Sequence, residues 1–223
     1  MQTTISTAEP SPQKPLLRGW SHAVSFPIWV LVGTALLIVA RVGLTGHLLL
    51  GVYVVGTGAM FLASAMYHRG RWTPKVKLRM QKVDRTAIFL AIAGGYTPIA
   101  AAALGSWTLV AVLVAAWVGA AVGMALQWIP TVHRALRGAS YMVVSWMAVF
   151  TFPQLYHGLG ATGFWLIVAG GICYTVGAIA LATRWPDPWP KVFGFHEVFH
   201  AFTVVAATLV FIAIVSAVAP KLA

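Results

Sequence analysis

Seven long apolar runs with few charges constrain this chain more than any other feature. The hydrocarbon core of a bilayer is about 30 Å thick, and a helix rising 1.5 Å per residue needs about 20 apolar residues to cross it. Because the runs are continuous and do not alternate in segments of about ten residues, they predict membrane helices and exclude a β-barrel. The seven predicted segments are Ala23–Ala40, Leu48–Tyr67, Val83–Ala103, Trp107–Trp128, Ser140–Tyr156, Gly163–Thr183 and Phe195–Val218.

Composition supports the same fold class. Hydrophobic residues make up 60% of the 223 residues and charged residues only 9%, whereas soluble domains carry about 25% charged residues. This excludes a soluble globular domain, and the high hydrophobicity excludes a disordered chain. We therefore expect an all-α, polytopic membrane protein, with a seven-transmembrane-helix bundle as one domain over residues 20–223. Residues 1–19 are polar and proline-containing, which predicts a disordered cytoplasmic tail.

The charges predict the orientation of this bundle. The chain has 15 Lys and Arg residues against 4 Asp and Glu residues. No basic element is interleaved with a nucleic-acid-binding motif, so we expect no nucleic-acid partner. With seven crossings, only Arg41 and Lys221 lie on the side opposite the N-terminus, which leaves thirteen basic residues on the N-terminal side. The positive-inside rule then places the N-terminus in the cytoplasm and the C-terminus outside, in a multi-pass protein of the cell membrane.

Local signals refine the helix boundaries. Thr73 followed by Pro74 predicts an N-cap with proline at the first helical position, so the third helix is expected to begin in the cytosol. Pro98 and Pro153 fall inside predicted helices, where proline is expected to cause kinks.

Ionisable residues at membrane depth cost about 2.5–3.5 kcal/mol each on insertion scales, so each needs a reason. His68 ends the second predicted segment, Asp84 begins the third, and His196 and His200 begin the seventh. All of these ends are predicted to be cytoplasmic. Segments far apart in the sequence therefore bring three histidines and a carboxylate to one depth.

The spacing of these residues predicts a metal site. His196 and His200 are four residues apart and share a helix face, as do Ser64 and His68. Two histidines at this spacing, with a third from another helix, provide three nitrogen ligands for Zn²⁺ and leave the fourth position open, which is typical of a catalytic site. The remaining histidines are expected to be interfacial or hydrogen-bonded groups; they are His22, His47, His133 and His157.

The string His196–His200 also fits the H-E-x-x-H pattern of metalloproteases, in which the glutamate is the general base. No His, Asp or Glu follows His200 to supply a further ligand. On an ideal helix Glu197 also lies about 100° from the His196 face. We therefore expect Glu197 to pair with a loop Arg or Lys at headgroup level.

Four motifs occur in order along the chain: Ser64-Ala-Met-Tyr-His68, Asp84-Arg-Thr-Ala-Ile-Phe, Gly95-Tyr-Thr-Pro98 and His196-Glu-Val-Phe-His200. Together with Arg18-Gly-Trp-Ser-His22 they resemble the hemolysin III family, the bacterial branch of the progestin and adipoQ receptors, which is grouped more widely with alkaline ceramidases. The resemblance covers about residues 18–205. Arg85 departs from the family, which usually has histidine after the aspartate, and this leaves the role of that side chain open.

The resemblance implies a seven-helix bundle with Zn²⁺ near the cytoplasmic leaflet, held by His68, His196 and His200. It implies that Asp84 holds the catalytic water and that Ser64 supports the site. The resemblance also implies hydrolysis of a lipid amide. Our leading hypothesis is a zinc-dependent hydrolase that acts on an amide or ester bond, with a membrane lipid as substrate or ligand. Two alternatives remain open. One is a receptor-like sensor or regulator of membrane homeostasis with structural zinc, and the other is a hemolysin-like cytolysin.

Overall fold

A computed structural model describes residues 14–223. Apart from one isolated β-bridge between Trp189 and Phe193, the regular structure of these residues is helical. The helices are α1 (Trp20–Val39), α2 (Leu44–Arg69), α3 (Pro74–Ala103), α4 (Ser106–Trp128), α5 (Arg134–Trp146), η1 (Met147–Thr151), α6 (Phe152–Thr183), α7 (Phe195–Ala213), η2 (Ile214–Val218) and η3 (Ala219–Lys221).

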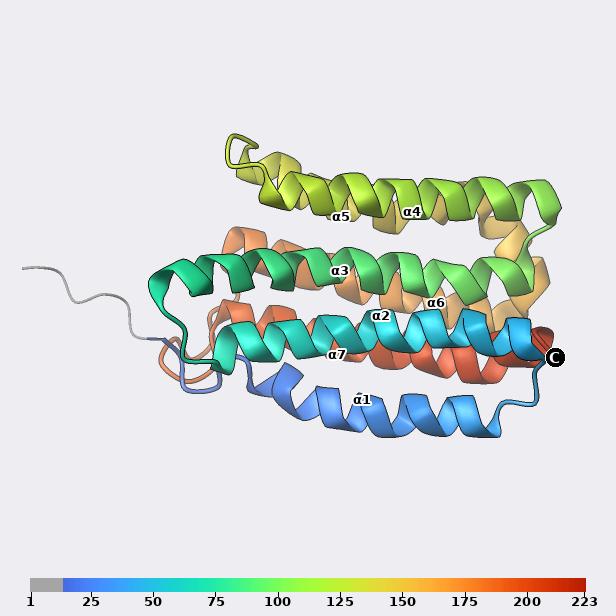
Figure 1. Ribbon diagram of the computed structural model, residues 1–223, viewed down its shortest axis with the longest axis horizontal. Helices are drawn as coiled ribbons and strands as arrows, with labels where there is room; N and C mark the ends of the chain where they lie inside the picture. Colours follow the sequence, from blue (N-terminus) through green and yellow to red (C-terminus); the bar gives the residue numbers. More distant parts are fainter. Residues whose placement is uncertain (1–13) are drawn as a thin grey trace, which may run out of the picture.

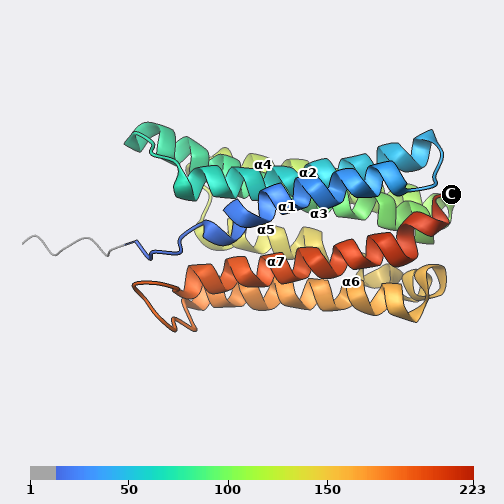
Figure 2. The same ribbon diagram turned by 90° about the horizontal axis from the view of Figure 1, so that it is seen from below.

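The long helices run side by side in one bundle (Figures 1 and 2). The closest neighbours in the chain pack most extensively, as α1 with α2, α2 with α3, α3 with α4, and α6 with α7. α3 also contacts α5 and α6, and α1 contacts α7, so the first and last long helices meet. The described N-terminal residues and the C-terminus lie at opposite ends of the bundle (Figure 1).

The surface of the bundle is apolar. Leu31 and Ile38 of α1 are 71% and 76% exposed, and Val55 of α2 is 70% exposed. Six helical stretches of the described residues are long and apolar enough to cross a membrane. Large exposed aliphatic side chains are stable in contact with lipid, where water gains no access to them. The protein is therefore an integral membrane protein.

The fifth predicted segment, Ser140–Tyr156, has different boundaries in the structure. The helical stretch begins earlier, at Arg134, and passes into the 3₁₀-helix η1 after Trp146. A new helix, α6, then begins at Phe152, so Pro153 lies in its first turn and does not kink a helix interior. Proline is tolerated there because the first N–H groups of a helix have no intrahelical partner.

α6 itself contains the sharp break in this region. Gly160 has φ 71° and ψ 171°, a conformation almost restricted to glycine. It separates a short helical piece at the far end of the bundle from the long part of α6, which runs back to Thr183. The chain therefore reverses here, and α5 with η1 and the long part of α6 replace the predicted fifth and sixth segments.

The prediction for the start of the third helix is confirmed. Thr73 is the N-cap residue of α3 and Pro74 occupies its first turn, although the Thr73 side chain makes no capping hydrogen bond. Pro98 lies inside α3, which continues to Ala103.

Glycines allow α2 and α3 to approach closely. A Cβ atom on Gly56 of α2 would lie 2.6 Å from the Leu90 carbonyl oxygen of α3, and one on Gly94 of α3 would lie 3.0 Å from the Val52 carbonyl oxygen of α2. Small residues at such crossings favour helix association in membranes because they let the backbones come together. This close contact places the end of α2, and hence His68, against the start of α3.

The predicted disordered tail, residues 1–19, falls mostly on residues 1–13, which lie outside the described residues. Residues 14–19 are described, and they pack against one end of the bundle, where His68 and the start of α7 also lie. We call this end the histidine end.

Candidate metal centre

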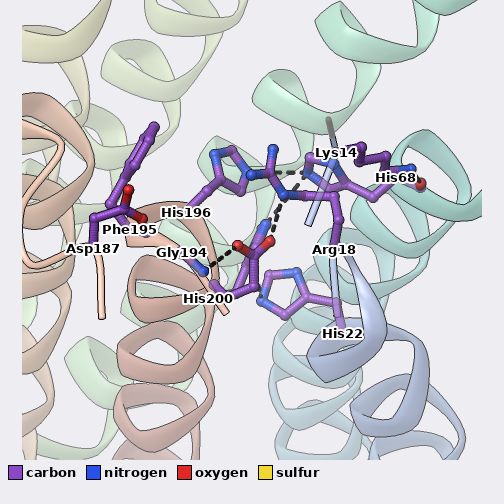
Figure 3. Close-up of polar contacts among 10 residues, drawn as sticks. Lys14, Arg18, His22, His68, Asp187, Gly194, Phe195, His196 and His200 are labelled. Atoms are coloured by element: carbon purple, nitrogen blue, oxygen red, sulfur yellow. Dashed lines mark hydrogen bonds and ion pairs between the residues drawn. The ribbon is translucent and has the colours of Figure 1, made fainter. Parts of the chain in front are cut away.

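Three histidines converge at the histidine end. His68 is the next-to-last residue of α2, and His196 and His200 lie in the first two turns of α7. His196 and His200 point from the same face of α7 toward His68, as Figure 3 shows. The prediction that these three residues meet is confirmed.

The start of α7 is held in place by two carboxylates. The Gly194 N–H donates to Glu197 Oε2 at 3.0 Å, and the Phe195 N–H donates to Asp187 Oδ1 at 2.9 Å. These bonds satisfy N–H groups that a helix terminus otherwise leaves without partners. They define where α7 begins, and so the depth at which its histidines lie.

The distances between the ring nitrogens suit a metal ion. His68 Nε2 is 3.2 Å from His196 Nε2 and 3.3 Å from His200 Nε2. All three ligand atoms lie within 4.8 Å of one another. Two nitrogen ligands at 2.0–2.1 Å from a tetrahedral ion are about 3.3 Å apart. The three imidazoles therefore fit a divalent ion, and the cluster can hold a metal.

The triad is largely buried and lies next to basic residues. His68 and His200 are buried and His196 is half-buried. Lys14 bonds to the His68 carbonyl oxygen and Arg18 to Glu197, so both cations lie at this end of the bundle. Burial, with Arg69, Lys77 and Arg18 nearby, lowers the pKa of Lys14 itself. Positive charge is thus concentrated around this site.

Ser64 and Asp84 lie beside one another, outside the triad. Ser64 is buried one turn before His68 on α2, and the Asp84 carboxyl group of α3 neighbours its hydroxyl. The Ser64 Oγ atom completes no hydrogen bond with a described residue. Asp84 is not part of the group of atoms that lie within 4.8 Å of one another. The group of atoms spaced so that it could hold a metal ion therefore consists of the three histidines and does not include Asp84.

Glu197 takes the role expected from its position on the helix. Its Oε1 atom forms an ion pair with Arg18, and its Oε2 atom accepts the Gly194 N–H. The side chain is only 2% exposed and that of Arg18 20%. Both carboxylate oxygens therefore bond to groups outside the triad. Glu197 is not placed as the general base of a protease-type H-E-x-x-H site.

The segment before α1 was not expected to take part in the site. The Lys14 ammonium donates to the His68 carbonyl oxygen, and Arg18 pairs with Glu197. The Leu16 and Leu17 N–H groups donate to the Lys191 and Val192 carbonyl oxygens, each at 3.0 Å. We call residues 14–19 the N-terminal strap, because they tie the end of α2 to the start of α7 and to the loop before it.

His22 is a fourth imidazole in this cluster. It lies in the first turn of α1, is 2% exposed, and its Nε2 atom is 3.2 Å from His200 Nδ1. It is hydrogen-bonded, as expected of the remaining histidines, but its position beside the triad was not predicted. The only sequence signal was its place in the Arg18–His22 motif.

The other three histidines lie away from the triad. The exposed His47 ring contacts the Gly43 carbonyl oxygen at 3.0 Å, and His133 caps α5 by accepting the Ala135 N–H at 3.2 Å. His157 is exposed near the break at Gly160. Their expected roles as interfacial or hydrogen-bonded groups agree with these positions.

The similarity of this chain to known proteins shows its family. The family model described as Haemolysin-III related matches residues 11–211. The chain belongs to this family. It is 32% identical to Hemolysin-3 of Bacillus cereus over 174 residues, which cover 76% of this chain and 74% of the relative. It is 28% identical to the Hemolysin-3 homolog of Bacillus subtilis (strain 168) over 162 residues, which cover 72% of each chain. The family match includes all of α1 to α6 and the histidines of α7.

Proposed function

We propose that this haemolysin III family protein is a zinc-dependent hydrolase that cleaves an amide or ester bond of a membrane lipid. The observation that carries the proposal is the set of three buried or half-buried imidazoles at one end of an apolar bundle, spaced as metal ligands. Three protein ligands with an open fourth position are typical of catalytic zinc sites, whereas structural sites use four.

The chain's own residues suggest a division of roles. The Nε2 atoms of His68, His196 and His200 would hold the ion. When bound, zinc would supply Lewis-acid chemistry, polarising a carbonyl oxygen and lowering the pKa of water from about 15.7 to about 7. The Asp84 carboxylate would accept the proton of the attacking water and return it to the leaving amine or alcohol. The Ser64 hydroxyl, which has no other described partner, would hydrogen-bond this carboxylate or the developing oxyanion.

The position of the site supports a lipid substrate. The positive-inside rule places the histidine end on the cytoplasmic side of the cell membrane, at the level of the inner headgroups. An apolar cleft of about 500 Å³ lies between the end of α6, the following loop and α7, and includes Thr183, Trp185 and Phe202. Phe202 lies about 200° around the α7 axis from His200, so this cleft opens on a different face of α7 from the triad. It would hold an acyl chain beside the site, with the scissile bond reaching the triad around α7.

A test compares wild-type protein with His200→Ala and Asp84→Asn, with the exposed His157→Ala as matched control. Each purified variant is incubated with ceramide-like amides and with acyl esters of phospholipids, while zinc content and released fatty acid are measured. We expect one zinc per chain and fatty-acid release in the wild type and the control. His200→Ala should lose both, and Asp84→Asn should lose release but keep zinc. Equal release by wild type and His200→Ala, or none by the wild type, rejects hydrolysis.

A second candidate is a regulator of membrane homeostasis with structural zinc. The observation that favours it is the N-terminal strap, which joins Lys14 and Arg18 to both helices of the triad. Retained zinc in a wild-type protein that releases no fatty acid from either lipid class would favour this function. A cytolytic pore is less well supported, because the buried ionisable side chains cluster at one end and do not line a path through the bundle.

A further inference from the structure

His22 and His200 contact each other through ring nitrogens on the side of His200 that faces away from His68. His200 Nε2 is 3.3 Å from His68 Nε2, and its other nitrogen, Nδ1, is 3.2 Å from His22 Nε2 (Figure 3). His22 is outside the group of atoms spaced as metal ligands. It therefore contacts the triad through His200 and does not belong to the ligand set.

The His22 ring is held rigidly in this position. It packs edge-on against Phe61 of α2, with ring centroids 5.2 Å apart, and against His200, with centroids 4.1 Å apart. It lies in the first turn of α1, three residues after the end of the N-terminal strap. A ring packed on two sides cannot rotate freely, so its Nε2 atom keeps facing His200.

The tautomer of His200 decides whether it can bind a metal. A neutral imidazole carries one proton, and the nitrogen without the proton offers the lone pair. For Nε2 to face the ion with its lone pair, the proton of His200 must be on Nδ1. That N–H then needs an acceptor, and ligand histidines almost always find one in a neighbouring group.

We propose that His22 is a positioning residue for the metal centre: its Nε2 atom accepts the Nδ1–H of His200 and so holds His200 in the tautomer and orientation that present Nε2 to the ion. Among the described residues, His200 is the member of the triad whose second ring nitrogen has a hydrogen-bond partner. The His22 proton is then on Nδ1, an atom that is buried and has no partner among the described residues. A buried unpaired donor is unfavourable for folding. A role of the opposite nitrogen, Nε2, at the metal centre would explain why His22 occupies this position.

The inference depends on the proposed metal centre, and its test measures metal binding directly. Wild-type protein is compared with His22→Leu, which removes the acceptor, and with His22→Gln, whose side-chain oxygen can accept the same N–H. The exposed His157→Leu is the matched control. Zinc affinity is measured by competition with a chromophoric chelator, and the ligand field by the absorption spectrum of the Co²⁺-loaded protein.

We expect His22→Leu to bind zinc about 10–100-fold more weakly, and His22→Gln to recover most of this loss. The control should match the wild type. The Co²⁺ spectrum of His22→Gln should keep the band positions and intensity of the wild type, because the ligand set is unchanged. If His22→Leu does not fold, His22→Met replaces it as the variant without a strong acceptor.

Three results would overturn the inference. Wild-type affinity in His22→Leu would make His22 a packing residue. Equal losses in His22→Leu and His22→Gln would show that acceptance of a hydrogen bond is not the function of this ring. A Co²⁺ spectrum of His22→Gln that reports a changed coordination number would make His22 a ligand. If the wild type binds no metal, the metal centre itself fails, and this result is distinct from the other three.

Discussion

At the scale of single residues, Gly19 determines how closely the N-terminal strap approaches the triad. It has φ 80°, in the left-handed region, and a Cβ atom there would lie 2.3 Å from His68 Cβ. Because His68 Cβ is next to the backbone of α2, it cannot move aside as the tip of a flexible side chain does. A glycine is therefore required both by the conformation and by the contact.

We expect Gly19→Ala to displace His68 and to weaken zinc binding about tenfold or more. The free energy of unfolding should fall by about 1–3 kcal/mol from overpacking. Zinc affinity and the thermal unfolding midpoint check this. Gly43→Ala is the matched control, because Gly43 has a negative φ and no heavy atom within 4 Å of its added Cβ. A Gly19→Ala protein that equals this control in both measurements would contradict the argument.

The ion pair of Arg18 with Glu197 is the second feature at this scale. Glu197 is 2% exposed, so its charge has little access to water once the guanidinium is removed. We expect Arg18→Met to lower the free energy of unfolding by about 3 kcal/mol. Adding Glu197→Gln should restore much of this stability, because glutamine keeps an oxygen for the Gly194 N–H without a buried charge.

Unfolding of both single variants and the double variant in detergent would measure this coupling. Arg71→Met, on an exposed loop at the same end of the bundle, is the control for removal of one positive charge. The interpretation fails if the double variant is no more stable than Arg18→Met alone.

At the scale of helices, the contact between α2 and α3 positions Ser64 beside Asp84. The backbones approach through Gly56 and Gly94, where an added Cβ would meet carbonyl oxygens. Such oxygens belong to the rigid backbone of a helix and cannot be repacked. The spacing of the two helices is therefore sensitive to one methyl group.

We expect Gly56→Ala to lower stability by about 1–3 kcal/mol because it pushes α2 and α3 apart. Gly51→Ala, five residues earlier on α2, should leave stability unchanged or raise it by up to about 1 kcal/mol, since alanine favours a helix and no atom lies within 4 Å. Thermal unfolding of the two variants in the same detergent compares them directly. Equal midpoints would show that the close approach does not limit packing.

At the scale of the whole molecule, the positive-inside rule predicts that the histidine end faces the cytoplasm. Two exposed arginines in loops at opposite ends, Arg41 and Arg71, offer a matched test. With the single cysteine replaced in Cys173→Ala, we expect Arg41→Cys to react with a membrane-impermeant thiol reagent in intact spheroplasts. Arg71→Cys should react only after permeabilisation. The reverse pattern would place the histidine end outside.

Hydropathy was sufficient to predict the helical membrane bundle, and helical spacing together with the family resemblance predicted the convergence of His68, His196 and His200. The reason is that the bilayer imposes a length on each apolar run, and a spacing of four residues places two side chains on one helix face. Both are local properties of the chain. The region around Gly160 was the exception. Hydropathy is uniform there, so it did not predict that the chain changes direction at the non-helical backbone of Gly160.

The surroundings of the triad depended on tertiary structure. His22 and Arg18 meet their partners on α7 across 178 and 179 positions of sequence, and Ser64 meets Asp84 across the α2–α3 contact. No periodicity connects residues so far apart, because their contacts follow from how α1, α2, α3 and α7 pack and from how residues 14–19 cross the end of the bundle. A lipid environment determines which segments become helices, whereas side-chain packing between those helices determines which polar groups share a site.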